Sequence, residues 1–146
     1  MTAEAKDIIV IPVPKEMAGL VWDEVKGMLE KATFTAVGKC DIHDVKAGIE
    51  DGVYLLWVAM DGNTILAGMT TRIIEYPKCR ALALDWIGGV RMKDWLKLFN
   101  EQMVQHAKNN GCSHIEGYGR PAWLRWTRKF GWKEDYVTFK LEVQNG

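Results

Sequence analysis

Two acidic residues lie inside otherwise apolar segments, where a carboxylate can act as a general base. Asp85 interrupts the run ALALDWIGG, and Glu116 lies within SHIEGYG. A carboxylate in an apolar strand is costly unless it has a partner or a chemical task. For Asp85 the alternative is an ion pair with Arg72 or Arg80, and for Glu116 it is a position that faces solvent. The sequence leaves both alternatives open.

A basic cluster lies among tryptophans near the C-terminus. Within fourteen residues the chain carries five cations and no carboxylate: Arg120, Arg125, Arg128, Lys129 and Lys133. Such groups, with Trp123, Trp126 and Trp132 between them, could bind phosphates and stack bases, or dock an acidic protein surface. On a helix, however, the aromatic rings would face the core and the charges would face water. We treat Arg120, Arg125, Arg128 and Lys129 as a possible interaction surface.

The histidines and cysteines show no spacing typical of a metal site. They are His43, His106, His114, Cys40, Cys79 and Cys112. We therefore expect no metal site. The imidazoles should be hydrogen-bonded or exposed to solvent, and the thiols should be reduced and mostly buried, as in cytosolic proteins.

Composition indicates one globular domain, 1–146. The length of 146 residues is typical of a single core, and seven tryptophans can dominate that core or an interface. A formal net charge of zero argues against a protein held mainly by phosphate contacts. The first six residues lack the features of a secretion signal, and the longest apolar run, VYLLWVAM, is too short to cross a bilayer. We expect a cytoplasmic protein that does not enter membranes.

Hydrophobic periodicity positions these groups on a series of strands and helices. Strands are expected at 7–14, 53–60, 64–74, 79–89, 113–119 and 136–143, and helices at 17–32, 40–52, 93–109 and 121–130. Early antiparallel hairpins followed by a strand–helix–strand crossover predict an α/β fold. Its sheet would be mixed and mostly antiparallel, with helices on both faces.

This order of elements, with NNGCSHIEGYG and RPAWLRWTRKFGW, resembles the GCN5-related N-acetyltransferase (GNAT) superfamily over 53–143. The resemblance implies a single acyl-CoA N-acyltransferase domain, with acetyl-CoA as cofactor if the protein is active. The same segments look like small acetyltransferase-like proteins of tailed bacteriophages, some of which are internal virion proteins. That likeness implies a location in the host cytoplasm or the virion.

The resemblance also implies where the cofactor's diphosphate would bind. In GNAT enzymes it lies on backbone N–H groups of a glycine-containing turn at the start of the helix corresponding to 93–109. The family pattern falls on Arg91-x-x-Asp94-x-Leu96, where Asp94 and Leu96 replace small residues. A branched side chain removes room for the ligand, and Asp94 is expected to cap the helix N–H groups itself. This alignment implies that the diphosphate site is degenerate.

A different alignment would use the paired glycines as the cofactor loop. The residues concerned are Ile87, Gly88, Gly89, Val90 and Arg91. Otherwise Gly88 and Gly89 end the strand or form a bulge. A CoA 3′-phosphate would be a third possible ligand of the basic cluster.

The family's general acid, a tyrosine, would fall on Thr127. A threonine hydroxyl is a poor acid, so Tyr118 would have to substitute, unless it only packs at the sheet edge. The candidate catalytic residues are therefore Asp85, Glu116 and Tyr118.

Three functions are compatible with these residues. The first is a GNAT-fold protein that binds no cofactor and serves as a structural or interaction component, through a protein partner or self-association. The second is an acetyl-CoA-dependent N-acetyltransferase with an atypical cofactor loop. The third is a nucleic-acid-binding module that uses the Arg/Trp segment.

Overall fold

The computed structural model describes residues 7–34, 36 and 38–144. Residues 1–6, on which the expectation about secretion rests, lie outside that range. Five strands form one sheet in chain order: β1 (Ile8–Val13), β2 (Leu55–Asp61), β3 (Thr64–Glu75), β4 (Arg80–Gly89) and β5 (His114–Gly117). The first four pair antiparallel and β5 pairs parallel to β4, which confirms the predicted mixed sheet.

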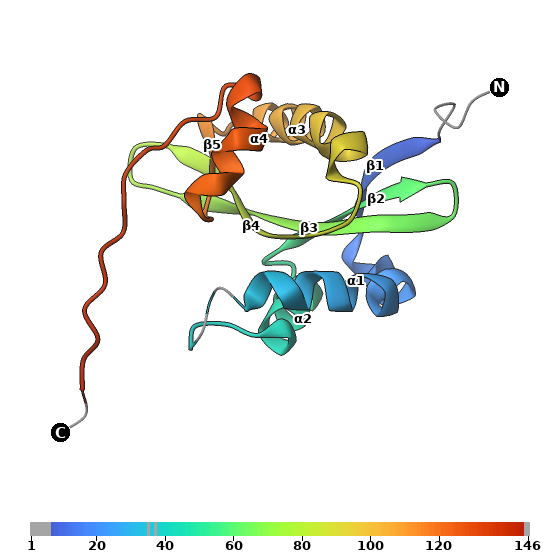
Figure 1. Cartoon of the computed structure of the whole chain (residues 1–146), viewed down its shortest axis with the longest axis horizontal. Coiled ribbons are helices and arrows are strands. Elements are labelled where there is room, and N and C mark those ends of the chain that lie inside the picture. The colour runs from blue at the N-terminus through green and yellow to red at the C-terminus, as the bar shows by residue number, and fades with distance from the viewer. Residues whose placement is uncertain (1–6, 35, 37, 145–146) are drawn as a thin grey trace.

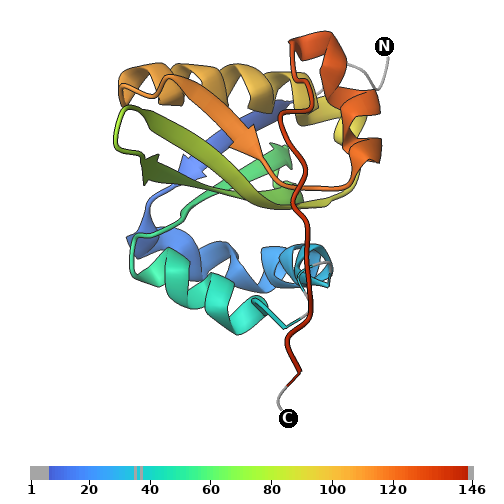
Figure 2. The same ribbon diagram turned by 90° about the vertical axis from the view of Figure 1, so that its left-hand side faces the viewer.

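Helices cover both faces of this sheet (Figures 1 and 2). The helices on one face are α1 (Ala18–Thr33) and α2 (Ile42–Glu50), and those on the other are α3 (Met92–Asn109) and the short α4 (Leu124–Thr127). Single 3-10 turns flank α4 at 121–123 and 128–130, so the predicted helix at 121–130 is a succession of short turns. No helix in the described part of the chain has the length and apolar character needed to span a bilayer.

Local chemistry explains where α2 starts. The Asp41 carboxylate accepts hydrogen bonds from the backbone N–H groups of His43 and Asp44, at 2.9 and 3.1 Å. The Asp44 carboxylate in turn accepts from the Asp41 N–H at 3.0 Å. This reciprocal capping satisfies donors that the first turn leaves unpaired and fixes the start of the helix.

The sheet separates two hydrophobic cores. On the α3 side, Trp57, Trp95 and Phe99 are buried, and Phe99 meets both indoles edge to face. On the other side, Val25 and Leu29 of α1 pack below the sheet with the apolar face of α2. The predicted tryptophan core is confirmed only in part, because Trp126 is 38% exposed.

Two sequence-based expectations are wrong. The segment 136–143 was expected to close the sheet as a strand, but it is extended and pairs with no strand in the described part of the chain. Alternating side chains specify an extended conformation and do not by themselves supply a pairing edge. The three cysteines are free thiols, but Cys79 is exposed and Cys40 and Cys112 are only half-buried.

A half-buried imidazole makes stability depend on pH. His106 of α3 lies edge to face against Trp57 at 5.5 Å, and burial lowers the pKa of His106 below its ordinary value of 6.5. The unfolded chain then takes up a proton at higher pH than the folded one, so the free energy of unfolding should fall as pH drops below about 6.5.

Urea unfolding between pH 7.5 and 5 checks this dependence on His106. His106→Gln should flatten the decline, whereas the exposed His43→Gln should leave it as in the parent chain. An unchanged slope in His106→Gln would contradict the assignment.

Candidate functional site

The candidate site lies where β4 and β5 separate. Their parallel pairing runs only from Ala81 opposite His114 to Leu84 opposite Gly117. Beyond that point β4 continues to Gly89, while β5 has ended and the chain turns away. The resulting opening holds a cavity of about 100 Å³, lined by β4, α3, the end of β5 and the turns around α4. Ligand sites for molecules of drug size are usually several times larger, roughly 300–1,000 Å³.

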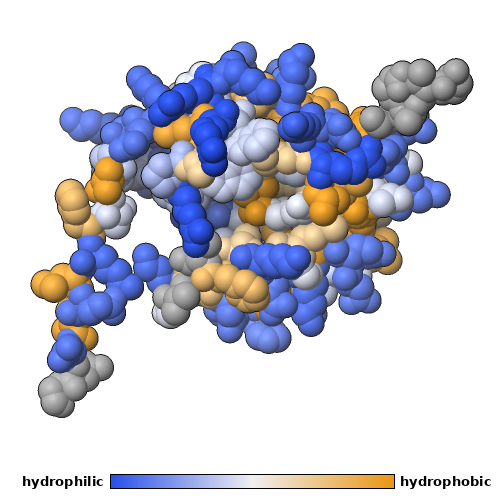
Figure 3. All heavy atoms as spheres, viewed as in Figure 1, coloured by the Kyte–Doolittle hydropathy of each residue, from blue (hydrophilic) through white to orange (hydrophobic). Residues whose placement is uncertain are grey.

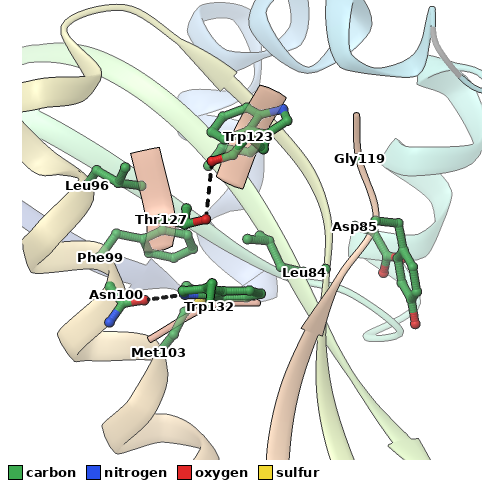
Figure 4. A pocket seen from close by; sticks show the side chains of 13 residues that line it. Leu84, Asp85, Leu96, Phe99, Asn100, Met103, Gly119, Trp123, Thr127 and Trp132 are labelled. Atoms are coloured by element: carbon green, nitrogen blue, oxygen red, sulfur yellow. Dashed lines mark hydrogen bonds between the residues drawn. The ribbon is translucent and has the colours of Figure 1, made fainter. Parts of the chain in front are cut away.

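Two indoles of the chain itself, Trp123 and Trp132, project into this opening (Figure 4). Trp132 is fixed by a 2.8 Å hydrogen bond from its Nε1 to the Asn100 side-chain oxygen. A Cβ at Gly117 would lie 3.2 Å from the Trp132 ring, and one at Gly119 would lie 3.1 Å from the Trp123 ring. This arrangement was not predicted from the sequence. The alternating glycines of GYG were the available signal, because they leave room for rings.

Asp85 forms an ion pair with Arg72, one of the two partners that the sequence left open. The Arg72 Nε lies 2.6 Å from one Asp85 carboxylate oxygen, and its terminal nitrogen lies 3.2 Å from the other. The side chain of Asp85 is only 10% exposed, so its carboxylate is largely removed from water. The positive charge of the Arg72 guanidinium compensates for this loss of hydration. Asp85 lines the cavity, and each of its carboxylate oxygens already accepts a hydrogen bond from Arg72.

Glu116 is surrounded by hydrogen-bond donors and does not simply face solvent. Its carboxylate accepts from Tyr76 Oη at 2.9 Å and from Tyr118 Oη, and it lies 2.9 Å from His114 Nε2. Burial alone would raise the pKa of Glu116, but hydrogen bonds from Tyr118, His114 and Tyr76 together lower it. Tyr76 joins this cluster from the end of β3, far away in sequence, and was not predicted.

Tyr118 connects this cluster to the cavity. It lines the cavity and is 52% exposed, and its hydroxyl donates to Glu116. Partial burial, followed by the hydrogen bond to Glu116, raises the pKa of Tyr118. The phenol therefore stays protonated at neutral pH. The structure thus brings two of the three catalytic candidates into contact, Glu116 and Tyr118, and Asp85 lines the same cavity.

The turn entering α3 is closed by an ionic network. Arg91 precedes the helix in the left-handed conformation, with φ 56° and ψ 42°. Its guanidinium lies 2.8 Å from the Asp94 carboxylate and 3.0 Å from that of Asp61, at the end of β2. The hydrogen bonds that the Arg91 guanidinium donates to Asp94 and then to Asp61 raise the pKa of Arg91. Lys93, the other cation of this turn, lies over the Trp126 ring, with Nζ 6.0 Å from its centroid.

These contacts change two details of the expected turn. Asp94 was expected to cap the helix, but Arg91 is the N-cap residue and the Asp94 carboxylate pairs with its guanidinium. The Asp94 N–H is bonded to the Arg91 carbonyl at 2.9 Å. Leu96 does not project into the turn. It is 8% exposed, packs in the core and narrows the cavity between β4 and β5.

The alternative cofactor loop, residues 87–91, is partly covered by α1 and β3. A Cβ at Gly88 would lie 2.1 Å from the Met28 carbonyl oxygen of α1, and one at Gly89 would lie 2.4 Å from the Ala67 side chain of β3. Gly88 and Gly89 therefore permit close packing of α1 and β3. Of their neighbours, Ile87 lines the cavity and Val90 is 57% exposed.

The predicted interaction surface is solvent-facing. Its four cations, Arg120, Arg125, Arg128 and Lys129, are all exposed, and no ion pair joins them to a carboxylate within 7–34, 36 and 38–144.

Thr127 lies at the position where the sequence resemblance places the general acid. It donates its hydroxyl hydrogen to the Trp123 carbonyl at 3.1 Å. Among the described residues no group of three or more His, Cys, Asp or Glu side chains could hold a metal ion.

Solved structures show the fold class. No protein-family model matches the sequence, and no curated protein matches it. The chain is similar to the aminoglycoside N-acetyltransferase AAC(6′)-Iy in complex with CoA, with 13% identity and a TM-score of 0.71, covering 97% of this chain and 99% of that one. An aminoglycoside acetyltransferase from an uncultured soil sample matches with 10% identity and a TM-score of 0.72, covering 94% and 99%.

A third similar structure is described as a transcriptional regulator from Bacillus halodurans C-125. It has 16% identity and a TM-score of 0.69, and the match covers 93% of this chain and 99% of that one. The chain therefore has the GNAT acetyltransferase fold, which confirms the fold implied by the sequence resemblance.

Proposed function

We propose that this chain is a GNAT-fold protein without acetyl-CoA-dependent catalysis, and that it acts as a structural or interaction component. The observation that carries the proposal is the ionic network at the entrance to α3. Two carboxylates, Asp61 and Asp94, share one guanidinium there, so the three side chains sum to one negative charge. This negative charge would repel a diphosphate, and Arg91 is already paired with the two carboxylates.

The opening between β4 and β5 supports the same proposal. The residues present do not fit a bound cofactor, because Trp123, Trp132 and Leu96 reduce the cavity to about 100 Å³. The Trp132–Asn100 hydrogen bond would have to break for this space to widen. A protein partner, or a virion as the likeness to phage proteins implies, would use the surface of the molecule instead.

A titration followed by thermal unfolding tests the proposal. A ligand at 100 times its Kd raises the free energy of unfolding by about 2.7 kcal/mol. We expect no shift in Tm at millimolar CoA or acetyl-CoA. A saturable rise that disappears when CoA is replaced by an equal concentration of inorganic diphosphate would contradict the proposal, because it would show specific cofactor binding.

Acyl transfer is the second candidate function, and the contact of Tyr118 with Glu116 favours it. A protonated phenol beside the cavity could donate a proton, and the neighbouring carboxylate holds its orientation. Detection of acetyl-CoA turnover that Tyr118→Phe abolishes, with unchanged Tm, would establish this candidate over the first.

A further inference from the structure

The C-terminal segment, residues 136–143, leaves the body of the protein beside β5 (Figures 1 and 2). Four apolar side chains alternate along it: Val137, Phe139, Leu141 and Val143, with 59%, 92%, 88% and 85% of their surface exposed. The opposite side carries polar groups, including Lys140 and Glu142, which form a 2.6 Å ion pair. Figure 3 shows apolar and polar residues alternating along the segment, clear of the body. This pattern is that of a strand with one face meant for burial.

The free edge of β5 offers a place for such a strand. β5 is the last strand in the sheet order and pairs only with β4 among the described strands. Beside it is a hollow of about 310 Å³ between α3 and the turn at 128–132. Val104, Ile115 and Phe130 supply apolar side chains to its wall. An unpaired edge next to an apolar hollow can accept an added strand, with main-chain hydrogen bonds on one side and side-chain pockets on the other.

We propose that residues 136–143 of one copy add to β5 of a second copy, so that two chains exchange C-terminal strands. Trp132 fixes the start of the segment through Asn100, and from there the chain runs outward instead of along its own β5. Each copy carries one donor strand and one acceptor edge, which a two-fold axis would pair twice. The formal net charge of zero gives the two copies no net repulsion.

This exchange would also affect the candidate site. Trp132 and Asn100 line both the hollow beside β5 and the cavity between β4 and β5. A partner strand in the hollow would therefore support the wall that narrows the cavity. The proposal does not depend on whether CoA binds, because its test measures molecular mass.

Light scattering during gel filtration tests the exchange. The full chain should elute with twice the 16.6 kDa mass of one copy. Phe139→Asp, in the donor strand, and Val104→Asp, in the acceptor hollow, should each halve the mass while the chain still unfolds cooperatively in urea. Thr138→Asp puts the same charge on the polar side of the strand and should remain dimeric.

Mixing the two monomeric variants distinguishes strand exchange from other dimers. Phe139→Asp keeps an intact hollow and Val104→Asp keeps an intact strand, so the mixture should form heterodimers joined by one exchange, seen by native mass spectrometry. A full chain that stays at 16.6 kDa, as it would if 136–143 folded back on its own β5, would overturn the proposal. Failure of the mixture to form heterodimers would overturn it as well.

Discussion

Phe99→Ala is expected to lower the free energy of unfolding by about 3–5 kcal/mol, the range measured when buried aromatic residues are truncated. Phe99 has no exposed surface, and its ring lies 5.8 Å from that of Trp57 and 6.4 Å from that of Trp95, edge to face in both cases. Truncation would leave a cavity between the Trp57 ring of β2 and the Trp95 ring of α3. Both the transfer energy of the lost atoms and the unfilled space then reduce stability.

Urea unfolding at one protein concentration measures the effect of Phe99→Ala. Glu101→Ala is the matched control, because Glu101 lies on the exposed face of the same helix and its ion pair with Lys97 is 3.7 Å long. Exposed pairs of this kind contribute roughly 0.3–0.5 kcal/mol. If Phe99→Ala cost no more than Glu101→Ala, the described core of α3 would be wrong.

Gly88→Ala is expected to destabilise the protein by about 1–3 kcal/mol, the usual cost of overpacking. The added methyl group would lie 2.1 Å from the carbonyl oxygen and 2.8 Å from the carbonyl carbon of Met28. Both are backbone atoms, so no side-chain rotation can relieve the clash. Helix α1 would have to move away from β4 and would lose part of the core that it forms there.

Gly27→Ala supplies a sharp control for Gly88→Ala. Gly27 is one residue before Met28 in α1, and nothing lies within 4 Å of the Cβ that it would acquire. In a helix this change should stabilise by up to about 1 kcal/mol. The comparison also separates two interpretations of Gly88. A glycine that only served a phosphate would tolerate alanine in the ligand-free protein, so a stable Gly88→Ala chain would favour the cofactor-loop alignment.

Most of the fold could be predicted because local patterns determine it. Trp95, Phe99, Met103 and Ala107 recur on one face of α3 and are all buried. The hairpin of β2 and β3 follows from two apolar runs around a DGN turn. The parallel pairing of β4 and β5 follows from the helix that separates them. In each case the residues that specify the element lie within it.

The sequence did not predict features that depend on distant partners. Tyr76 reaches Glu116 across 40 residues, and Asp61 of β2 reaches Arg91 at the start of α3. The left-handed conformation of Arg91 has no local signal, since glycine or asparagine usually occupies that region. For 136–143 the alternation indicated an extended chain, but the free edge that could receive it lies on β5.

The most direct test of the closed diphosphate site is a titration of ¹⁵N-labelled protein with CoA, followed by the amide signals of residues 88–95 in NMR spectra. Closure by Arg91, Asp94 and Asp61 predicts that these signals keep their positions up to millimolar CoA. Saturable shifts confined to these amides, with the signals of α2 unchanged, would show that the turn holds a diphosphate and would contradict the account.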